Sequence, residues 1–466
     1  MTALFDPLLT GALTLDALAA GIGGCDAIAA RQHLRLTRLL DAALRGSTFY
    51  REHLRGVIPG VTPLRNLPTV TRGELMARFD DWVTDPKLKL ADIRQFTANP
   101  RRIGEAYLDK YMIWESSGTS HQPGVFVQDA HAMAVYDALE AVRRSTPRLF
   151  HRCFDPMFQT ERVAFVGAIG GHFASVASIQ RLRRINPWMK TSVRCFSIMR
   201  ATSSLVNELN AFAPTVIVTY PTAALVLADK TTRRSLRVTP KEVWTGGEKL
   251  TVSARQRIEH ALGCTVRDSY GSSEFFAMGW ECAHGRMHAN TDWMILELID
   301  EHGRPVPAGQ RSHSTLLTNL ANHVQPLIRY ELGDQLTMSA KRCECGSPLP
   351  VIEVEGRSDD LLVMAGRDGQ PVTLLPLALT TVLEDEAGVF DFQLRQRGLH
   401  TLVLLLNMQG PQAADAAERC RAALKRFAAA QGVTPLRITI KLGKPSSAGR
   451  SGKAQRVVAS KVPMRH

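Results

Sequence analysis

Small hydroxyl-bearing residues and glycine gather between Trp114 and Val127, where the chain reads Trp-Glu-Ser-Ser-Gly-Thr-Ser-His-Gln-Pro-Gly-Val-Phe-Val. Glycine lets a backbone approach a ligand closely, and hydroxyls add hydrogen-bond donors without bulk. This composition predicts a loop around a polyphosphate, although ordinary polar turns have the same composition. It is not a Walker loop, because no Gly-Lys-Ser/Thr ends it and an apolar strand follows. The residues that would wrap the anion are Ser116, Ser117, Gly118, Thr119 and Ser120.

Two downstream stretches carry groups that could hold the rest of a nucleotide. In Asp-Ser-Tyr-Gly-Ser-Ser-Glu, the ring of Tyr270 could stack on a purine and Glu274 could hold Mg²⁺, which takes oxygen ligands. Asp334 follows a glycine and could grip two ribose hydroxyls. The plainer alternatives are a strand that ends in a turn, for the first stretch, and a surface salt bridge, for the second.

Two cations lie further along the chain. Arg357, in Gly-Arg-Ser-Asp-Asp, could contact ribose or phosphate, and Lys453 lies in the Gly/Ser-rich run Ser-Gly-Lys-Ala-Gln-Arg. For Lys453 the alternative is a solvated tail.

Cysteine and histidine form a separate cluster that could bind a metal. Cys282, His284 and His288 lie in Glu-Cys-Ala-His-Gly-Arg-Met-His, and Cys343 and Cys345 form a pair downstream. Three thiolates and one imidazole make a closed tetrahedral zinc site. The Cys-x-Cys spacing is shorter than usual, so spacing alone leaves the metal open.

The elements that must position these residues are short buried strands separated by helices. Apolar strands are predicted at 162–169, 214–219 and 242–245, and helices at 129–145 and 252–262. This alternation is typical of α/β architecture with largely parallel sheets, in which ligands bind at the carboxyl ends of the strands.

The flanking segments predict scaffold and a second domain. Residues 29–46 predict an amphipathic helix, and the run from Thr71 to Glu74 resembles a helix start. After about residue 356 a smaller α+β pattern begins. We expect a large N-terminal domain of mixed and parallel sheets, residues 1–356, and a small C-terminal α+β domain, residues 357–466.

Composition limits the class of protein. The chain has 466 residues, of which 45% are hydrophobic, and a formal net charge of +13. We expect a cytoplasmic protein without a membrane span, because no signal peptide and no apolar run of about 18 residues is present. The eight scattered cysteines predict thiols or ligands rather than disulfides. The charge favours an anionic partner such as a nucleotide, coenzyme A or an acidic carrier protein, and no signature supports nucleic acid.

In order and combination, these motifs resemble the adenylate-forming superfamily of acyl-CoA synthetases, adenylation domains and luciferases, and most of all its phenylacetate-CoA ligase-like branch. The resemblance runs from Ser47 to Arg456 and implies an AMP-binding N-terminal domain, a C-terminal lid, and the use of ATP, Mg²⁺ and coenzyme A. One departure is notable. Where the phosphate loop usually continues Gly-Lys-Pro, this chain has His121-Gln122-Pro123, so His121 or another cation would have to replace the lysine.

The resemblance also implies a role for each residue. Around the nucleotide it places Ser116, Ser117, Gly118, Thr119, Ser120, Gly246, Gly247, Glu248, Tyr270, Gly271, Ser272, Asp334 and Arg357. The catalytic residues would be Glu274 on Mg²⁺, Ser273 on phosphate or the acyl carboxylate, and Lys453 at the transition state. The hinge would be Asp359 or Asp360. The acyl pocket is expected at His172, Phe173, Tyr220 and Ala223, and it suits a flat aryl acid. A structural Zn²⁺ would be held by Cys282, His288, Cys343 and Cys345, with His284 as substitute ligand.

The implied reaction has two stages. A carboxylate attacks the α-phosphorus of ATP and releases pyrophosphate; the small domain then turns, and a thiol attacks the acyl-adenylate. We expect a small acid as substrate and coenzyme A as acceptor. Transfer to the phosphopantetheine of a carrier protein or to a protein thiol is the alternative, and a non-catalytic nucleotide-binding protein is the alternative of another class. The branch suggests a homodimer.

Overall fold

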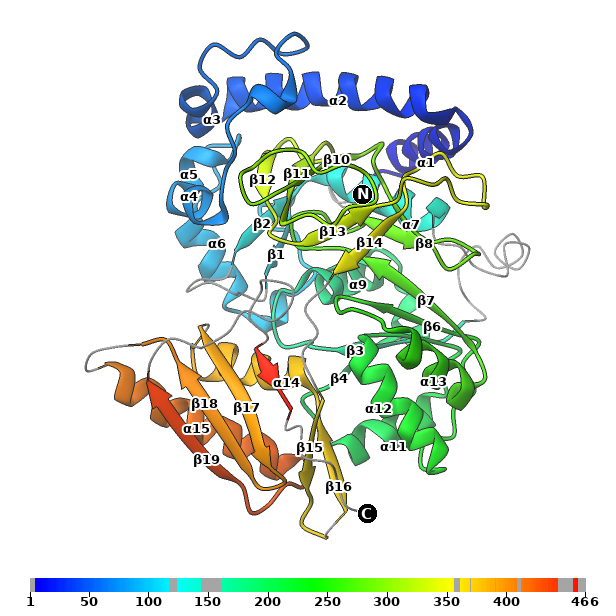
Figure 1. Cartoon of the computed structure of the whole chain (residues 1–466), viewed down its shortest axis with the longest axis vertical. Coiled ribbons are helices and arrows are strands. Elements are labelled where there is room, and N and C mark those ends of the chain that lie inside the picture. The colour runs from blue at the N-terminus through cyan, green and yellow to red at the C-terminus, as the bar shows by residue number, and fades with distance from the viewer. Residues whose placement is uncertain are drawn as a thin grey trace.

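The computed structural model describes residues 5–116, 124–143, 161–355, 361–368, 370–389, 391–408, 412–442 and 456–459. Figure 1 shows helices at the N-terminal end, sheets in the centre, and a second group of strands and helices at the C-terminal end. We call the described residues between 361 and 459 the C-terminal unit.

The N-terminal part is helical. Its elements are α1 (Pro7–Ile22), α2 (Gly24–Gly46), α3 (Thr48–His53), η1 (Leu64–Asn66), α4 (Arg72–Ala77), α5 (Phe79–Trp82), α6 (Leu90–Thr97) and η2 (Pro100–Arg102). The helix predicted at 29–46 is confirmed within α2. The predicted start at Thr71 is confirmed as a capping box, in which Thr71 and Glu74 each bond the other's backbone N–H. The box fixes where α4 begins.

The largest sheet has seven strands in the order β4-β3-β5-β6-β7-β8-β9. The strands are β3 (Val163–Gly167), β4 (Val193–Ser197), β5 (Val216–Thr219), β6 (Glu242–Gly246), β7 (Thr265–Tyr270), β8 (Gly279–Glu281) and β9 (Met287–Ala289). Strands β4, β3, β5, β6 and β7 pair in parallel, whereas β8 and β9 pair antiparallel to their neighbours. The helices of this region are α9 (Ala174–Ile185), α10 (Met189–Ser192), α11 (Thr202–Phe212), α12 (Pro221–Thr232) and α13 (Val252–Leu262). The predicted α/β architecture is confirmed.

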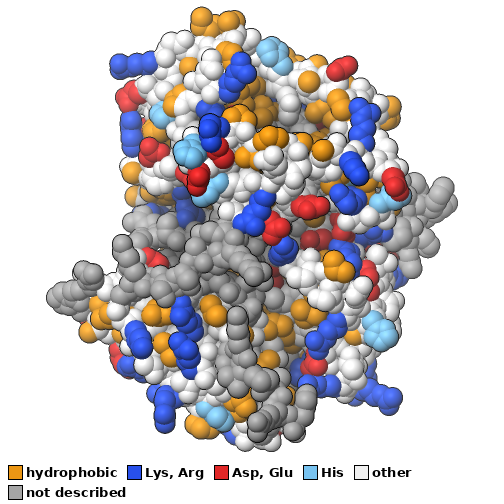
Figure 2. Space-filling view, in the orientation of Figure 1, with side chains coloured by type: hydrophobic (Ala, Val, Ile, Leu, Met, Phe, Trp, Pro, Cys, Tyr) orange, Lys and Arg blue, Asp and Glu red, His pale blue; other side chains and the backbone are white. Residues whose placement is uncertain are grey.

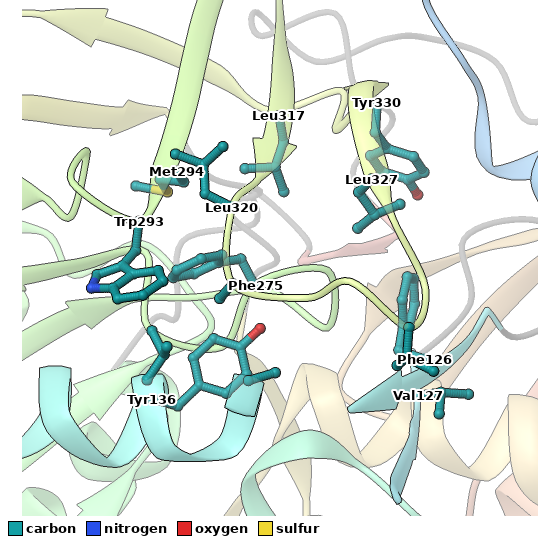
Figure 3. Packing of buried hydrophobic residues seen from close by; sticks show 14 of the residues in the cluster. Phe126, Val127, Tyr136, Phe275, Trp293, Met294, Leu317, Leu320, Leu327 and Tyr330 are labelled. Atoms are coloured by element: carbon teal, nitrogen blue, oxygen red, sulfur yellow. The ribbon is translucent and has the colours of Figure 1, made fainter. Parts of the chain in front are cut away.

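Smaller antiparallel sheets surround the central one. Strand β1 (Met112–Glu115) pairs with β2 (Val125–Gln128), and β2 leads into α7 (Ala130–Arg143). A three-stranded sheet contains β10 (Met294–Ile299), β11 (Ser314–Asn319) and β12 (Leu327–Glu331), and β13 (Gln335–Met338) pairs with β14 (Ile352–Glu355). Figure 3 shows how Phe126, Tyr136 and Phe275 pack with Trp293 and Tyr330 where these elements meet.

The C-terminal unit is built on a four-stranded sheet in the order β19-β18-β17-β20. Its elements are β15 (Leu362–Ala365), β16 (Pro371–Leu374), α14 (Pro376–Thr381), η3 (Val382–Glu386), β17 (Phe392–Gly398), β18 (Thr401–Leu406), α15 (Gln412–Ala430), β19 (Arg437–Leu442) and β20 (Val457–Val458). One apolar cluster joins this unit to the large sheet, since it contains Ile217 and Leu227 together with Leu379 and Leu424. The predicted boundary near residues 356–360 lies outside the described residues, and the division into two domains stays a prediction.

On the face that Figure 2 shows, Lys and Arg side chains are spread among Asp and Glu rather than gathered in one patch. Among the described helices, none is both long enough and apolar enough to cross a membrane.

Candidate functional site

Glycines lie at or just after the ends of two adjacent strands of the large sheet, β6 and β7. At the end of β6, a Cβ on Gly246 would lie 2.7 Å from the Ser269 hydroxyl, and Gly247 adopts a positive φ of +78° that favours glycine. The next residue, Glu248, accepts hydrogen bonds from the backbone N–H and the hydroxyl of Thr222, both at 3.0 Å. Glu248 thereby ties the end of β6 to the first turn of α12.

The Gly-Ser-Ser-Glu turn after β7 is tight. A Cβ on Gly271 would lie 2.1 Å from the carbonyl oxygen of Phe276, so only glycine fits there. The backbone N–H of Ser272 donates to the Phe275 carbonyl at 3.0 Å. The Ser273 carbonyl accepts from the indole N–H of Trp114 at 2.8 Å, which connects the turn to the strand before the predicted phosphate loop.

Two tyrosine–carboxylate pairs hold the predicted nucleotide-binding acids. The hydroxyl of Tyr270 donates to Asp334 at 2.8 Å, and the hydroxyl of Tyr330 donates to Glu274 at 2.8 Å. Both tyrosine rings and Glu274 are buried, while Asp334 is half-buried. The structure thus brings together two motifs that lie 64 residues apart in the chain.

The electrostatics of this cluster follow from burial. Burial raises the pKa of the Glu274 carboxyl, whereas the Tyr330 hydrogen bond and the positive charge of Arg72 lower it. Burial also raises the pKa of the Tyr270 hydroxyl, and the charge of Asp334 raises it further. A cation near Glu274 therefore favours its ionised form, which is the form that binds Mg²⁺.

The ends of the predicted phosphate loop are joined by hydrogen bonds. Ser116 donates its backbone N–H to the Gly124 carbonyl at 2.9 Å, and its hydroxyl accepts from the Gly124 N–H at 2.9 Å. The loop is thus closed at its base. Several predicted site residues lie outside the described residues: Ser117, Gly118, Thr119, Ser120, His121, Arg357, Asp359, Asp360 and Lys453.

Arg72 is a cation of this site that sequence reasoning missed. A guanidinium nitrogen of Arg72 donates to the Ser116 hydroxyl at 3.4 Å, and its charge acts on the pKa of both Glu274 and Tyr330. The residue is the first of α4, and Val70 just before it pairs in parallel with Tyr330. The capping box at Thr71 marks a helix start in the sequence but gives no sign of this contact.

The residues expected in the acyl pocket come from two segments, residues 172–173 and the start of α12, and the Tyr220 hydroxyl contacts Ala168 and Ser175 on either side of the first segment. His172 is buried, its Nε2 lies 3.3 Å from the Asn99 carbonyl, and its ring packs on Phe96. The following residue, Phe173, makes a parallel bridge with Glu115, so this loop runs beside β1. Tyr220 precedes α12, and its ring lies 3.4 Å from the position of a Cβ on Gly247.

Ala223, the fourth expected pocket residue, belongs to the helix that Tyr220 precedes. It is buried in the first turn of α12 and lines a cavity of about 20 Å³ together with Ile198, Leu374 and Phe427. It thus packs toward the C-terminal unit in this structure. The role of all four residues in acid binding stays a prediction.

The four predicted metal ligands meet in space. The ligand atoms of Cys282, His288, Cys343 and Cys345 all lie within 4.8 Å of one another. The Nδ1 of His288 lies 2.8 Å from the Leu349 carbonyl, so Nδ1–H donates to it and Nε2 faces Cys345 Sγ at 3.3 Å. This donor set and the second hydrogen bond of the imidazole fit a structural zinc ion. His284 is exposed and lies outside this group.

Comparison with known proteins gives relatives along most of the chain. It is 26% identical over 362 residues to a phenylacetate-coenzyme A ligase of Thermus thermophilus, a match that covers 73% of each protein. It is 30% identical over 179 residues to a phenylacetate-coenzyme A ligase of Pseudomonas putida, with 35% of this chain and 39% of that protein covered. Protein CapK of Staphylococcus aureus is 26% identical over 212 residues, 43% of each chain. The last two matches span less than half of those proteins. No protein-family model matches the chain.

Solved structures show the same fold. A 2-hydroxyisobutyryl-CoA ligase, solved with 2-HIB-AMP and CoA in the thioesterification state, superposes with a TM-score of 0.54 at 21% identity, over 92% of this chain and 88% of that one. The fold, the order of the motifs and the similarity to the Thermus protein agree. The sequence similarity to phenylacetate-coenzyme A ligases supports the predicted resemblance to the phenylacetate-CoA ligase-like branch of the adenylate-forming superfamily.

Proposed function

We propose that this protein is an AMP-forming acid–thiol ligase that activates a small carboxylic acid, favouring an aryl acid, and transfers the acyl group to coenzyme A. The observation that carries the proposal is that Glu274, in the turn after β7, lies close enough to Asp334 and Arg72 for their charges to act on its carboxyl group, while Arg72 also contacts Ser116. The carboxyl ends of parallel strands such as β7 are where α/β proteins bind ligands. The names of the Thermus and Pseudomonas relatives support the same reaction class.

Each side chain has a task that its surroundings suit. Asp334, oriented by the Tyr270 hydroxyl, would accept hydrogen bonds from the ribose. Glu274 is the carboxylate that would hold Mg²⁺, and its hydrogen bond from Tyr330 keeps one oxygen in place. When bound, Mg²⁺ offsets the negative charge of the phosphates. The Gly271 turn would let the backbone approach the nucleotide.

Arg72 would supply the positive charge that the phosphate loop lacks. The usual lysine is absent from His121-Gln122-Pro123, and Arg72 contacts Ser116 at the base of the same loop. A guanidinium forms bidentate hydrogen bonds with phosphate oxygens and stays charged at every physiological pH. This contact supports a catalytic protein over a nucleotide-binding protein that has lost its reaction.

We also propose that Lys453 assists adenylation, that Arg357 supports the ribose, and that the chain turns at Asp359 or Asp360 between the two stages. These roles rest on the resemblance alone. Zinc, held by the Cys282, His288, Cys343 and Cys345 group, would be structural, because four protein ligands leave no open position for a substrate.

The deciding experiment is acid-dependent pyrophosphate release across benzoic, hydroxybenzoic, phenylacetic, cinnamic and short aliphatic acids, with and without coenzyme A. We expect a strong response to one aryl class and a thioester only when coenzyme A is present. Thioester formed only on a pantetheinylated carrier protein would contradict the coenzyme A assignment. Pyrophosphate silence with retained ATP binding would instead identify a non-catalytic nucleotide-binding protein.

A further inference from the structure

The side-chain amide of Gln431 forms hydrogen bonds between the C-terminal unit and the part of the chain that contains the large sheet. Gln431 follows the last residue of α15, and its Oε1 accepts from the backbone N–H of Thr202 at 3.1 Å and from the Thr202 hydroxyl at 3.2 Å. Its Nε2 donates to the carbonyls of Met199 and Arg200 at 3.3 and 2.6 Å. Both ends of the amide are therefore used in contacts with the segment between β4 and α11.

These contacts complete a helix end that lacks a cap of its own. The residue at the N-cap of α11 is Ala201, which has no side chain able to accept a hydrogen bond. Thr202 is the first residue of the helix, and its N–H is one of the donors that a helix leaves unsatisfied. Gln431 supplies the missing acceptor from a point 229 residues further along the chain.

The surroundings make these hydrogen bonds directional within an otherwise apolar contact. Next to the amide, a cavity of about 20 Å³ is lined by Ile198 and Leu205 from one side and by Leu374 and Phe427 from the other. Apolar packing tolerates rotation because it has no preferred direction, whereas four hydrogen bonds to one segment accept only one geometry. This amide therefore adds directional contacts to the apolar packing between the two parts.

We propose that Gln431 is a positioning residue that selects the observed orientation of the C-terminal unit by capping α11. The inference rests on the proposed two-stage reaction, because an orientation matters to catalysis only if the unit must turn between adenylation and thioester formation. Loss of the cap would let the unit leave this orientation more often, which would favour one half-reaction at the expense of the other.

The sharpest variant is Gln431→Glu. This substitution keeps the size of the side chain but replaces the donating NH₂ group by an oxygen that faces the Met199 and Arg200 carbonyls. Both hydrogen bonds are therefore lost, and acceptor atoms are left facing one another. Gln431→Met removes the hydrogen bonds without adding a charge. Gln412→Glu, at the exposed start of the same helix, is the matched control.

Three measurements test the proposal on the full chain. Hydrogen exchange of residues 199–205 should speed up by about 5- to 30-fold in both Gln431 variants, the effect of losing a helix cap. The small-angle X-ray scattering profile, which reports how the C-terminal unit is oriented on the rest of the chain, should change in both Gln431 variants and stay the same in Gln412→Glu. Acid-dependent pyrophosphate release and coenzyme A acylation from preformed acyl-adenylate should shift in opposite directions.

The possible failures are distinguishable. Faster exchange with unchanged scattering, or with both half-reactions lowered equally, would reduce Gln431 to a structural cap and overturn the proposal. Unchanged exchange would overturn it directly. Silence of the wild-type chain in both half-reactions would count against the proposed function, and scattering would then still decide whether Gln431 sets the orientation.

Discussion

Replacing Arg72 by glutamine removes one positive charge from the base of the predicted phosphate loop while keeping hydrogen-bonding capacity. The guanidinium lies 3.4 Å from the Ser116 hydroxyl and acts on Glu274 as a charge. A hydrogen bond to a charged group contributes about 1.5–3 kcal/mol. If Arg72 contacts phosphate in the transition state, Arg72→Gln should lower kcat/KM for adenylation by about 10- to 100-fold.

The same substitution should change the pH profile, because the charge of Arg72 lowers the pKa of the Glu274 carboxyl. Without that charge, the pKa of Glu274 rises, and a higher pH is needed to produce the carboxylate that holds Mg²⁺. The acidic limb of the kcat/KM profile should therefore move to higher pH. Arg72→Lys keeps a point charge and should move the limb less while losing the bidentate geometry.

The assay is acid-dependent pyrophosphate release at varied ATP, between about pH 5 and pH 9. Arg78→Gln is the matched control, since Arg78 directly follows α4 and pairs with Glu52 and Asp81 instead of the site. A rate loss with an unmoved acidic limb would show that Arg72 does not control the ionisation of Glu274. A variant with wild-type kcat/KM would refute the role altogether.

Three further predictions concern Tyr270, the group of three cysteines and His288, and Asp268. Tyr270→Phe should weaken ATP binding by about tenfold, because Asp334 loses the hydroxyl that orients it. The control is Tyr111→Phe, which removes a similar hydrogen bond to Asp85. Equal effects of the two substitutions on ATP binding would contradict the role of Tyr270. The protein purified without added zinc should carry about one zinc ion per chain. Cys345→Ser should lose this zinc and have a lower Tm, whereas Cys25→Ser should keep both the zinc and the Tm. Absence of stoichiometric metal in the wild-type protein would contradict the zinc assignment. Burial raises the pKa of Asp268 from 3.8 to about 6, so the stabilisation by its protonated form, complete below pH 3.8, is lost as the pH rises through 6. In urea titrations, the free energy of unfolding of the wild type should therefore fall by about 3 kcal/mol relative to that of Asp268→Asn between pH 4 and pH 8. Parallel pH dependences of the two proteins would contradict this prediction.

The sequence is sufficient to predict those parts of the site that depend on local chemistry. The turn at Gly271 was predictable because glycine marks a tight backbone, and the predicted strands at 162–169, 214–219 and 242–245 correspond to β3, β5 and β6. The grouping of Cys282, His288, Cys343 and Cys345 was also predicted, although Cys-x-Cys spacing is short. Strands β8 and β9 bring Cys282 and His288 close across a hairpin, and the loop before β14 adds the other two cysteines.

Contacts between distant segments could not be predicted from spacing. Tyr270 was expected to stack on a purine, and its hydroxyl donates a hydrogen bond to Asp334, in the loop between β12 and β13. Arg72 lies 44 residues before Ser116, and what brings them together is the pairing of Val70 with Tyr330 of β12. No local pattern encodes that pairing, because it depends on how the N-terminal helices settle on the three-stranded sheet.

The position of the C-terminal unit also depends on contacts between segments that are far apart in the sequence. Its apolar residues share one cluster with those of the large sheet, and this cluster supplies affinity between the two parts without fixing an angle. An enzyme that must use two orientations needs contacts that are specific and still few enough to break. Four hydrogen bonds from Gln431, at about 0.5–1.5 kcal/mol net each, amount to a few kcal/mol, which is the range in which both states of a two-state element remain populated.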